Sequence, residues 1–168
     1  MSIRATVAAV VAVVLAALTG CTPAPTDQAA APGVETVEVI AVVDGDTIDI
    51  ATDAGTARVR LIGIDTPEIG RDGEQGECYA EEARDFLDAL VYGRAVEVRS
   101  DPSQADADRY GRLLRHVIID GNSAAVLALE AGAGYEYTYD QAYDGQDQHR
   151  AAEQAAADAG AGLWAACS

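Results

Sequence analysis

Three segments in which apolar residues dominate or alternate with polar ones open the folded part of the chain. Val37 to Val43 is an apolar strand candidate, and Thr47 to Ala51 follows it after the turn signal Asp44-Gly45. A second turn signal, Asp53-Ala54-Gly55, precedes the third candidate, Ala57 to Ile64, which is apolar on both faces. The pattern predicts an antiparallel meander of three strands.

Helical spacing of apolar residues follows the meander. It predicts helices from Cys78 to Val91 and from Asn122 or Ser123 to Glu130, and an Ala-rich helix from Gln148 to Ala159. Two more strands are predicted between the first two helices, at Ala95 to Val98 and Leu113 to Ile119. Five short strands with a helix after the third predict an α+β, mainly β fold: a five-stranded OB-fold Greek-key barrel with three helices.

The first 35 residues carry a different pattern. Residues 1–20 contain an apolar run of about 14 residues, which is too short for a transmembrane helix of roughly 20 residues. Leu18-Thr19-Gly20-Cys21 resembles the bacterial lipoprotein cleavage box. The resemblance implies a signal peptide over 1–20 and an exported protein, lipid-anchored through Cys21 at the outer face of the cell membrane; the alternative is an ordinary signal that leaves a secreted protein. Residues 21–35 then form a flexible tether to one domain over 36–168.

Two cysteines remain once Cys21 is assigned to the anchor. Cys78 and Cys167 form an even pair on an exported chain, which favours a disulfide over two free thiols. The bond would close a loop of about 90 residues and hold the C-terminal tail in place.

The charge balance limits the partners. The 168 residues include 28 Asp and Glu, 11 arginines and no lysine, for a net charge of −17. Such a surface repels a polyanion at low salt, although salt screens most of that repulsion beyond about 8 Å. We therefore expect nucleic acid to bind only weakly and nonspecifically.

Carboxylates in two motifs suggest a cation site. Asp46 lies just past a tight turn and Asp65 at a strand end, so pairing of the second and third strands can bring both to one mouth of the barrel. Pro67 restricts Thr66 to an extended backbone, which can turn the Thr66 carbonyl toward a hard cation such as Ca²⁺. Glu68 could then act as general base on an ordered water. Ordinary turn chemistry and an exposed loop glutamate are the alternatives for single residues.

Two arginines complete the candidate site. Arg60 lies in a strand that should be largely buried, and Arg112 precedes the predicted fifth strand. A purely structural role is open for both, because Asp106 and Asp108 could simply hold Arg112. Together they could clamp a phosphate while negative charge builds on its oxygens. A bound divalent cation would make the site positive overall.

At these residues the chain resembles the staphylococcal nuclease, or thermonuclease, family. The shared motifs span about Val37 to Trp164: Asp-Gly-Asp-Thr, Arg-Leu-x-Gly-Ile-Asp-Thr-Pro-Glu, Asp-Arg-Tyr-Gly-Arg-Leu, Glu-Ala-Gly-x-Gly and Gly-Leu-Trp. The resemblance implies Ca²⁺ ligands at Asp46, Asp65 and the Thr66 backbone, water activation at Glu68, and phosphate contacts from Arg60 and Arg112. It also implies sugar-nonspecific hydrolysis of DNA and RNA phosphodiesters that leaves 3′-phosphate products.

The chain departs from the family at the substrate groove. It lacks the lysines that often line this groove, and the loop from Ile69 to Glu77 offers only Arg71 among several acids. Tyr110 is a candidate for base stacking. Tyr137 and Tyr139 are further substrate-binding candidates, with core packing as the alternative.

The remaining features of the sequence say less about function. The segment Asp140–Asp147 could hold a second Ca²⁺, but we expect a solvated acidic loop because no bidentate glutamate follows at EF-hand spacing. We place His116 in a strand and His149 on a helix surface. We expect a monomer. A noncatalytic OB-fold binding module of the cell envelope and a cation-binding structural lipoprotein are the alternatives to a nuclease.

Overall fold

The structure is a computed structural model that describes residues 33–167. Among these residues the elements are β1 (Val34–Asp44), β2 (Thr47–Thr52), β3 (Gly55–Leu61), β4 (Gly63–Asp65), α1 (Ala80–Val91), β5 (Ala95–Arg99), β6 (Leu113–Ile119), β7 (Asn122–Ser123), α2 (Ala124–Glu130), β8 (Tyr135–Tyr137), α3 (Gln146–Ala159) and α4 (Leu163–Ala166). The predicted signal peptide, the lipidation at Cys21 and nearly all of the predicted tether lie outside the described residues. No helix in the described range is long and apolar enough to cross a membrane.

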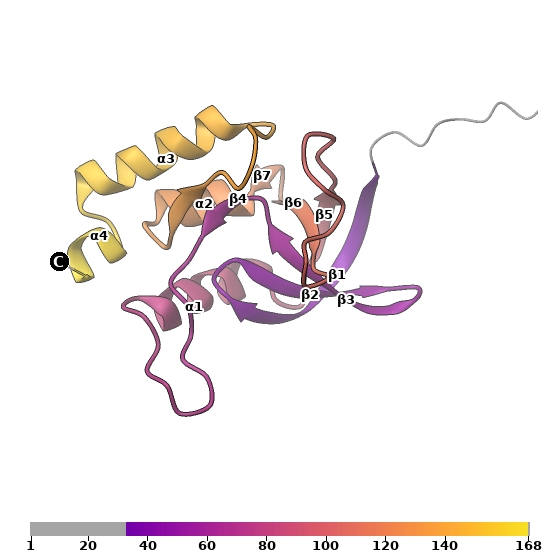
Figure 1. The fold of residues 1–168 in the computed structure, drawn as a ribbon, viewed down its shortest axis with the longest axis horizontal. Helices are drawn as coiled ribbons and strands as arrows, with labels where there is room; N and C mark the ends of the chain where they lie inside the picture. The colour runs from indigo at the N-terminus through magenta and orange to yellow at the C-terminus, as the bar shows by residue number, and fades with distance from the viewer. Residues whose placement is uncertain (1–32, 168) are drawn as a thin grey trace, which may run out of the picture.

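Five strands form a closed barrel, which confirms the predicted OB-type fold (Figure 1). Antiparallel pairs join β3 to β2, β2 to β1, β1 to β5 and β5 to β6. The barrel closes through a short parallel pairing between β3 and β6, in which Val59 lies opposite Leu113. This closure brings the chain entering β6 beside the end of β3. Residues 54 positions apart in sequence therefore become neighbours.

The core lies inside the barrel and beneath α1 and α2. Val39, Ile48 and Val59 from the first three strands are fully buried, as alternation along half-buried strands predicts. Leu87 of α1 and Leu129 of α2 are buried against them in the same cluster. These packed layers hold the β-strands, and with them the polar residues at the strand ends, in fixed positions.

The third strand differs from the prediction. We expected one strand from Ala57 to Ile64, but β3 ends at Leu61 and the chain turns at Gly63, whose φ is +85°. A side chain at Gly63 would meet the Tyr143 ring at 2.6 Å, so both space and backbone favour glycine there. The separate strand β4 then pairs with β8, which the sequence did not predict. The break redirects Asp65 to the edge of the barrel mouth.

The ends of the domain also differ in detail. β1 begins at Val34, three residues before the predicted start, because it pairs with β5 from Val34 onward. The predicted last helix is present as α3, and a short helix α4 follows it. Cys167, just after α4, forms a disulfide with Cys78 just before α1, with Cα atoms 5.8 Å apart. The tail is thus tied to α1.

The placement of His149 on a helix surface was wrong. Its side chain is buried, with Nδ1 3.0 Å from the Gly145 carbonyl and the ring edge-on to Tyr143. α3 packs against β4 and α2 along this side, which the apolar pattern of the helix did not reveal because alanines dominate its buried face. His116 lies in β6 as predicted, with Nε2 3.0 Å from an oxygen of Asp101.

Candidate active site

A buried guanidinium lies at the centre of the site. Arg60, near the end of β3, has its Nε 3.0 Å from Asp46 Oδ1 and its Nη2 2.7 Å from Asp65 Oδ1. Its Nη1 donates to the carbonyls of Leu61 and Ile64 at 2.7 and 2.5 Å. All three nitrogens are therefore engaged, which meets the requirement that a buried charge be paired and hydrogen-bonded. Arg60 joins the two predicted cation ligands.

Asp46 is the most enclosed carboxylate of the site. Its side chain accepts hydrogen bonds from Thr47 Oγ1 at 2.9 Å and from the Thr66 backbone N–H at 3.0 Å. Burial and the neighbouring Asp44 raise the pKa of Asp46 well above its usual range, although Arg60 acts in the opposite direction. Arg60 therefore offsets only part of the cost of keeping the buried Asp46 carboxylate ionised.

The tight turn before Asp46 has a packing reason for its glycine. A Cβ on Gly45 would lie 2.8 Å from Thr66 Oγ1, so only glycine lets the β1–β2 turn approach the segment that follows β4. Asp44 Oδ1 accepts the Asp46 N–H at 3.3 Å, which is the turn role the sequence predicted for it. This close approach puts Asp46 in contact with Thr66.

Asp65 and Glu68 lie on the solvent-exposed side of the site. The Asp65 side chain is 52% exposed although one of its oxygens contacts Arg60. Partial burial raises the pKa of Glu68, and the charges of Asp44 and Asp65 raise it further. Both carboxylates remain accessible to solvent and to a ligand.

Arg112 is held in place by Asp108 four residues earlier. Asp108 Oδ2 accepts from Arg112 Nε at 2.7 Å, while Oδ1 accepts the backbone N–H groups of Tyr110 and Arg112. The predicted structural partner is therefore present, but it uses only one edge of the guanidinium. The Arg112 side chain stays 29% exposed and its Cζ lies 5.6 Å from the centre of the Tyr110 ring.

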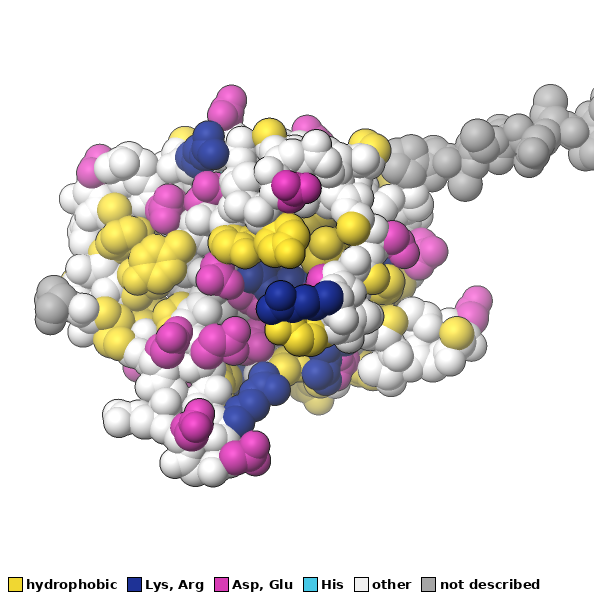
Figure 2. Space-filling model, in the orientation of Figure 1, with side chains coloured by type: hydrophobic (Ala, Val, Ile, Leu, Met, Phe, Trp, Pro, Cys, Tyr) yellow, Lys and Arg dark blue, Asp and Glu magenta, His cyan; other side chains and the backbone are white. Residues whose placement is uncertain are grey.

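A cleft of about 410 Å³ brings these side chains together. It is lined by Arg60, Asp65, Glu68 and Arg112 and also by the three predicted substrate-binding tyrosines, Tyr110, Tyr137 and Tyr139. Tyr110 and Tyr139 are 69% and 75% exposed, so they are not core residues. On this face of the molecule basic and hydrophobic side chains gather near the centre and acidic ones surround them (Figure 2). The structure thus brings Arg60, Asp65, Glu68, Arg112 and the tyrosines to one cleft, while Asp46 and Thr66 are buried beside it; the roles of these residues stay predictions.

The donor set suits a hard cation better than a soft one. Asp46, Asp65 and the Thr66 carbonyl offer oxygen only, which is the ligand type of Ca²⁺ and Mg²⁺. Among residues 33–167 no group of three His, Cys, Asp or Glu side chains converges as a metal cluster, either here or in the Asp140–Asp147 loop. A cation at this site would thus depend on backbone and water oxygens besides the two aspartates. Such a cation would stabilise the ionised form of the buried Asp46 carboxyl, which burial disfavours.

Sequence reasoning missed one residue that shapes the site. Glu77 accepts the Glu68 backbone N–H through Oε2 at 2.9 Å, and its own N–H donates to the Glu68 carbonyl at the same distance. The two residues lie at the ends of a loop with no periodic pattern, so no sequence signal pointed to the contact.

Comparisons with known proteins agree with this geometry. The chain matches the family described as "Staphylococcal nuclease homologue" over residues 58–166, a range that contains Arg60, Asp65, Glu68 and Arg112 but not Asp46 and the turn around it. It is 29% identical over 130 residues to the Thermonuclease of Staphylococcus hyicus, covering 77% of this chain and 76% of that protein. It is 32% identical over 123 residues to the SPbeta prophage-derived endonuclease YokF of Bacillus subtilis, and 39% identical over 77 residues to a Micrococcal nuclease of Shigella flexneri. These two alignments cover 73% and 46% of this chain but only 41% and 38% of the relatives.

Proposed function

The chain belongs to the staphylococcal nuclease family and is a phosphodiester-cleaving hydrolase, and from this premise we propose that it is a Ca²⁺-dependent, sugar-nonspecific nuclease acting outside the cell. One observation carries the proposal: a single cleft is lined by Arg60, Asp65, Glu68 and Arg112, and the buried Asp46 forms an ion pair with Arg60. A noncatalytic binding module would not require these carboxylates and arginines to line the same cleft.

The two arginines bind and neutralise the scissile phosphate. Arg60 is fixed by two carboxylates and two carbonyls, so it loses little conformational freedom when a phosphate binds. Arg112 keeps one edge of its guanidinium turned from Asp108 and available to a second phosphate oxygen. Preorganised donors of this kind stabilise the charge that develops on the phosphate oxygens in the transition state.

Glu68 serves as the general base. Its raised pKa, caused first by partial burial and then by Asp44 and Asp65, makes it a better proton acceptor than an ordinary surface glutamate. It takes a proton from water as the water oxygen bonds to phosphorus and the bond from phosphorus to the 5′ oxygen breaks. The departing 5′ oxygen takes up a proton from solvent. The products are a 3′-phosphate and a free 5′-hydroxyl.

Asp46, Asp65 and the Thr66 carbonyl would hold the Ca²⁺ ion. When bound, the ion would supply positive charge that offsets the surrounding carboxylates and favours an anionic substrate. Asp46 is suited to this role because Arg60 offsets only part of the cost of burying its charge, so a cation beside it would stabilise the ionised carboxylate.

The exposed tyrosines and the scarcity of basic side chains point to flexible, unpaired strands as substrate. Tyr110 and Tyr139 present ring faces on which any base can stack, independently of the sugar. The net charge of −17 disfavours tight binding of duplex polyanions. We further propose a monomer that is exported and lipid-anchored through Cys21; the Cys78–Cys167 disulfide supports an oxidising compartment.

Digestion of single-stranded DNA and of RNA tests the proposal. The purified protein should cleave both with Ca²⁺ and neither with a chelator, and readdition of Ca²⁺ should restore cleavage. Cleavage that persists in chelator contradicts the Ca²⁺ dependence, and no cleavage under any metal condition contradicts the nuclease.

A further inference from the structure

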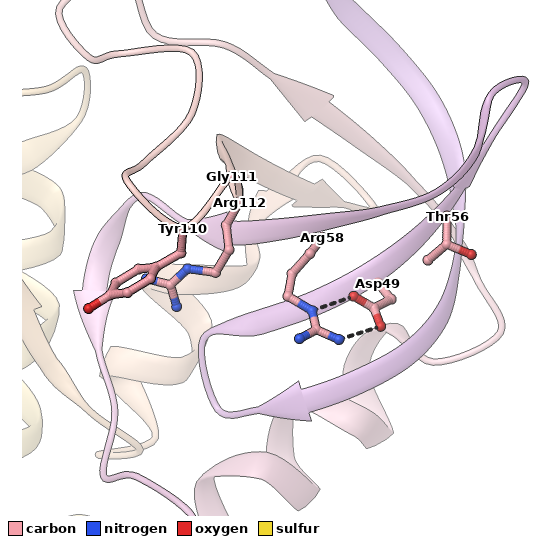
Figure 3. A pocket seen from close by; sticks show the side chains of 6 residues that line it. All are labelled: Asp49, Thr56, Arg58, Tyr110, Gly111 and Arg112. Atoms are coloured by element: carbon pink, nitrogen blue, oxygen red, sulfur yellow. Dashed lines mark hydrogen bonds and ion pairs between the residues drawn. The ribbon is translucent and has the colours of Figure 1, made fainter.

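A second pocket adjoins the active-site cleft on the outer face of the barrel. Its volume is about 370 Å³, and it is lined by Asp49, Thr56, Arg58, Tyr110, Gly111 and Arg112. Tyr110 and Arg112, which Figure 3 labels, also line the active-site cleft, so the two pockets are adjacent. A nucleic-acid strand that left the cleft past Tyr110 would enter this pocket.

The pairing of the barrel strands places several arginines beside one another between the cleft and this pocket. Arg58 and Arg60 lie two residues apart on β3 and share its outer face, while Val59 between them is buried inside. Two residues of strand span roughly 6.6 Å, a spacing comparable to that of consecutive phosphates in an extended nucleic-acid strand. The parallel pairing of Val59 with Leu113 sets Arg112 next to Arg58.

Arg58 is held in a fixed orientation with one edge unused. Its cross-strand partner Asp49 accepts from Nε at 2.8 Å and from Nη2 at 3.0 Å. The third nitrogen, Nη1, makes no hydrogen bond within the described part of the chain. It points away from Asp49, toward the side of the pocket where Arg112 and Tyr110 lie (Figure 3). The side chain is 46% exposed.

We propose that Arg58 binds the phosphate next to the scissile one. Arg60 and Arg112 hold the scissile phosphate, Tyr110 stacks on a base beside it, and Nη1 of Arg58 donates to the neighbouring phosphate. Asp49 neutralises much of the Arg58 charge, so the subsite adds directed hydrogen bonds rather than a strong field. The subsite makes a strand of several nucleotides a better substrate than a dinucleotide. This inference rests on the proposed nuclease function and deepens it.

The test compares kcat/KM for a thymidine dinucleotide, which has one phosphate, with that for a thymidine octanucleotide. Arg99→Ala is a matched control, since Arg99 is also 46% exposed and paired with a neighbouring carboxylate, that of Glu97, on β5. The octanucleotide-to-dinucleotide ratio should fall about 3- to 10-fold in Arg58→Ala and Arg58→Gln. It should stay at its starting value in the control.

Salt gives a second readout. For a single strand, loss of one full phosphate contact reduces the slope of log affinity against log salt by about 0.7. Because Asp49 neutralises much of the Arg58 charge, the Arg58 variants should show a measurable reduction that is smaller than this. An unchanged ratio and slope in both Arg58 variants, with the unsubstituted protein active, overturns the subsite but leaves the nuclease standing. Inactivity of the unsubstituted protein on both substrates overturns the proposed function and the subsite with it.

Discussion

Glu77 holds Glu68 by both of that residue's backbone groups. The Glu68 N–H donates to Glu77 Oε2 and the Glu68 carbonyl accepts the Glu77 N–H, both at 2.9 Å. The contact closes the loop between the two residues at its base. Glu77 is followed directly by Cys78, which the disulfide ties to the C-terminal tail. The proposed general base is thus positioned by a residue that itself does not line the cleft.

Replacing Glu77 should therefore impair catalysis more than substrate binding. In Glu77→Ala the Glu68 N–H loses its acceptor, and a shift of the carboxylate should lower kcat by about 10-fold with KM nearly unchanged. Glu77→Gln, which retains a side-chain acceptor oxygen, should recover most of kcat. Glu74→Ala, in the exposed middle of the same loop, is the matched control.

A double-variant cycle separates positioning from general loss of structure. Once Glu68→Gln has removed the base, adding Glu77→Ala should lower kcat little further. Additive losses from the two substitutions would show that Glu77 acts independently of Glu68.

Calcium should stabilise the fold through Asp46 and Asp65. At a Ca²⁺ concentration 100 times the dissociation constant, the free energy of unfolding should rise by about 2.7 kcal/mol. Asp65→Asn should abolish most of this gain, whereas Asp140→Asn should preserve it because Asp140, although it also lines the cleft, is not one of the predicted Ca²⁺ ligands. Thermal unfolding with and without Ca²⁺ measures both effects. A gain that depends on Asp140 instead would move the cation site to that loop.

The disulfide should contribute strongly to stability. It joins residues 89 positions apart, and constraint of a loop of this length in the unfolded chain is worth about 4 to 5 kcal/mol. Urea unfolding should show a loss of that order in a Cys78→Ser, Cys167→Ser double variant. An equal midpoint for the variant and the oxidised protein would mean that the link constrains neither state.

Asp101 should make stability sensitive to acid. Burial raises the pKa of this carboxyl, but hydrogen bonds from His116, the Asp144 N–H and Ser103 outweigh burial and hold the pKa at about 2. Because the folded pKa lies below the unfolded value, the stabilisation is complete above about pH 4 and is lost as the pH falls toward 2. The shift is worth about 2 kcal/mol.

Asp101→Asn isolates this contribution. The difference in unfolding free energy between the wild type and this variant should shrink from pH 5 to pH 2. Asp53→Asn, in the exposed β2–β3 turn, should show no such convergence. A difference that stays constant over this range would assign the stabilisation to contacts that do not require an ionised Asp101.

The barrel could be predicted because its signals are local. Alternation in Thr47 to Ala51 and the turn at Asp44-Gly45 specify the first hairpin, and Ser123 caps α2 as its sequence suggests, with Oγ accepting the Val126 N–H. The family and the nuclease activity were likewise predicted from the motifs and are confirmed. The roles of the individual site residues stay predictions.

The features that the sequence did not predict depend on contacts between residues that are far apart in the chain. β4 and β8 are three-residue strands. They form because the backbone turns at Gly63 and the residues from there on pair with Tyr135–Tyr137. His149 is buried because α3 packs through alanines, which carry almost no periodic signal. The Arg58–Asp49 and Glu68–Glu77 contacts arise from strand register and loop closure, so neither could be inferred before the fold.

Turnover of a single phosphodiester by Arg60 and Arg112 variants tests the central claim most directly. With Ca²⁺, the unsubstituted protein should convert a thymidine dinucleotide to thymidine 3′-phosphate and thymidine. Arg60→Ala and Arg112→Ala should each lower kcat by about 100- to 1,000-fold, while Arg84→Ala on α1, which does not line the cleft, should not. Undiminished kcat in folded Arg60 and Arg112 variants would contradict an active site built on these two guanidiniums.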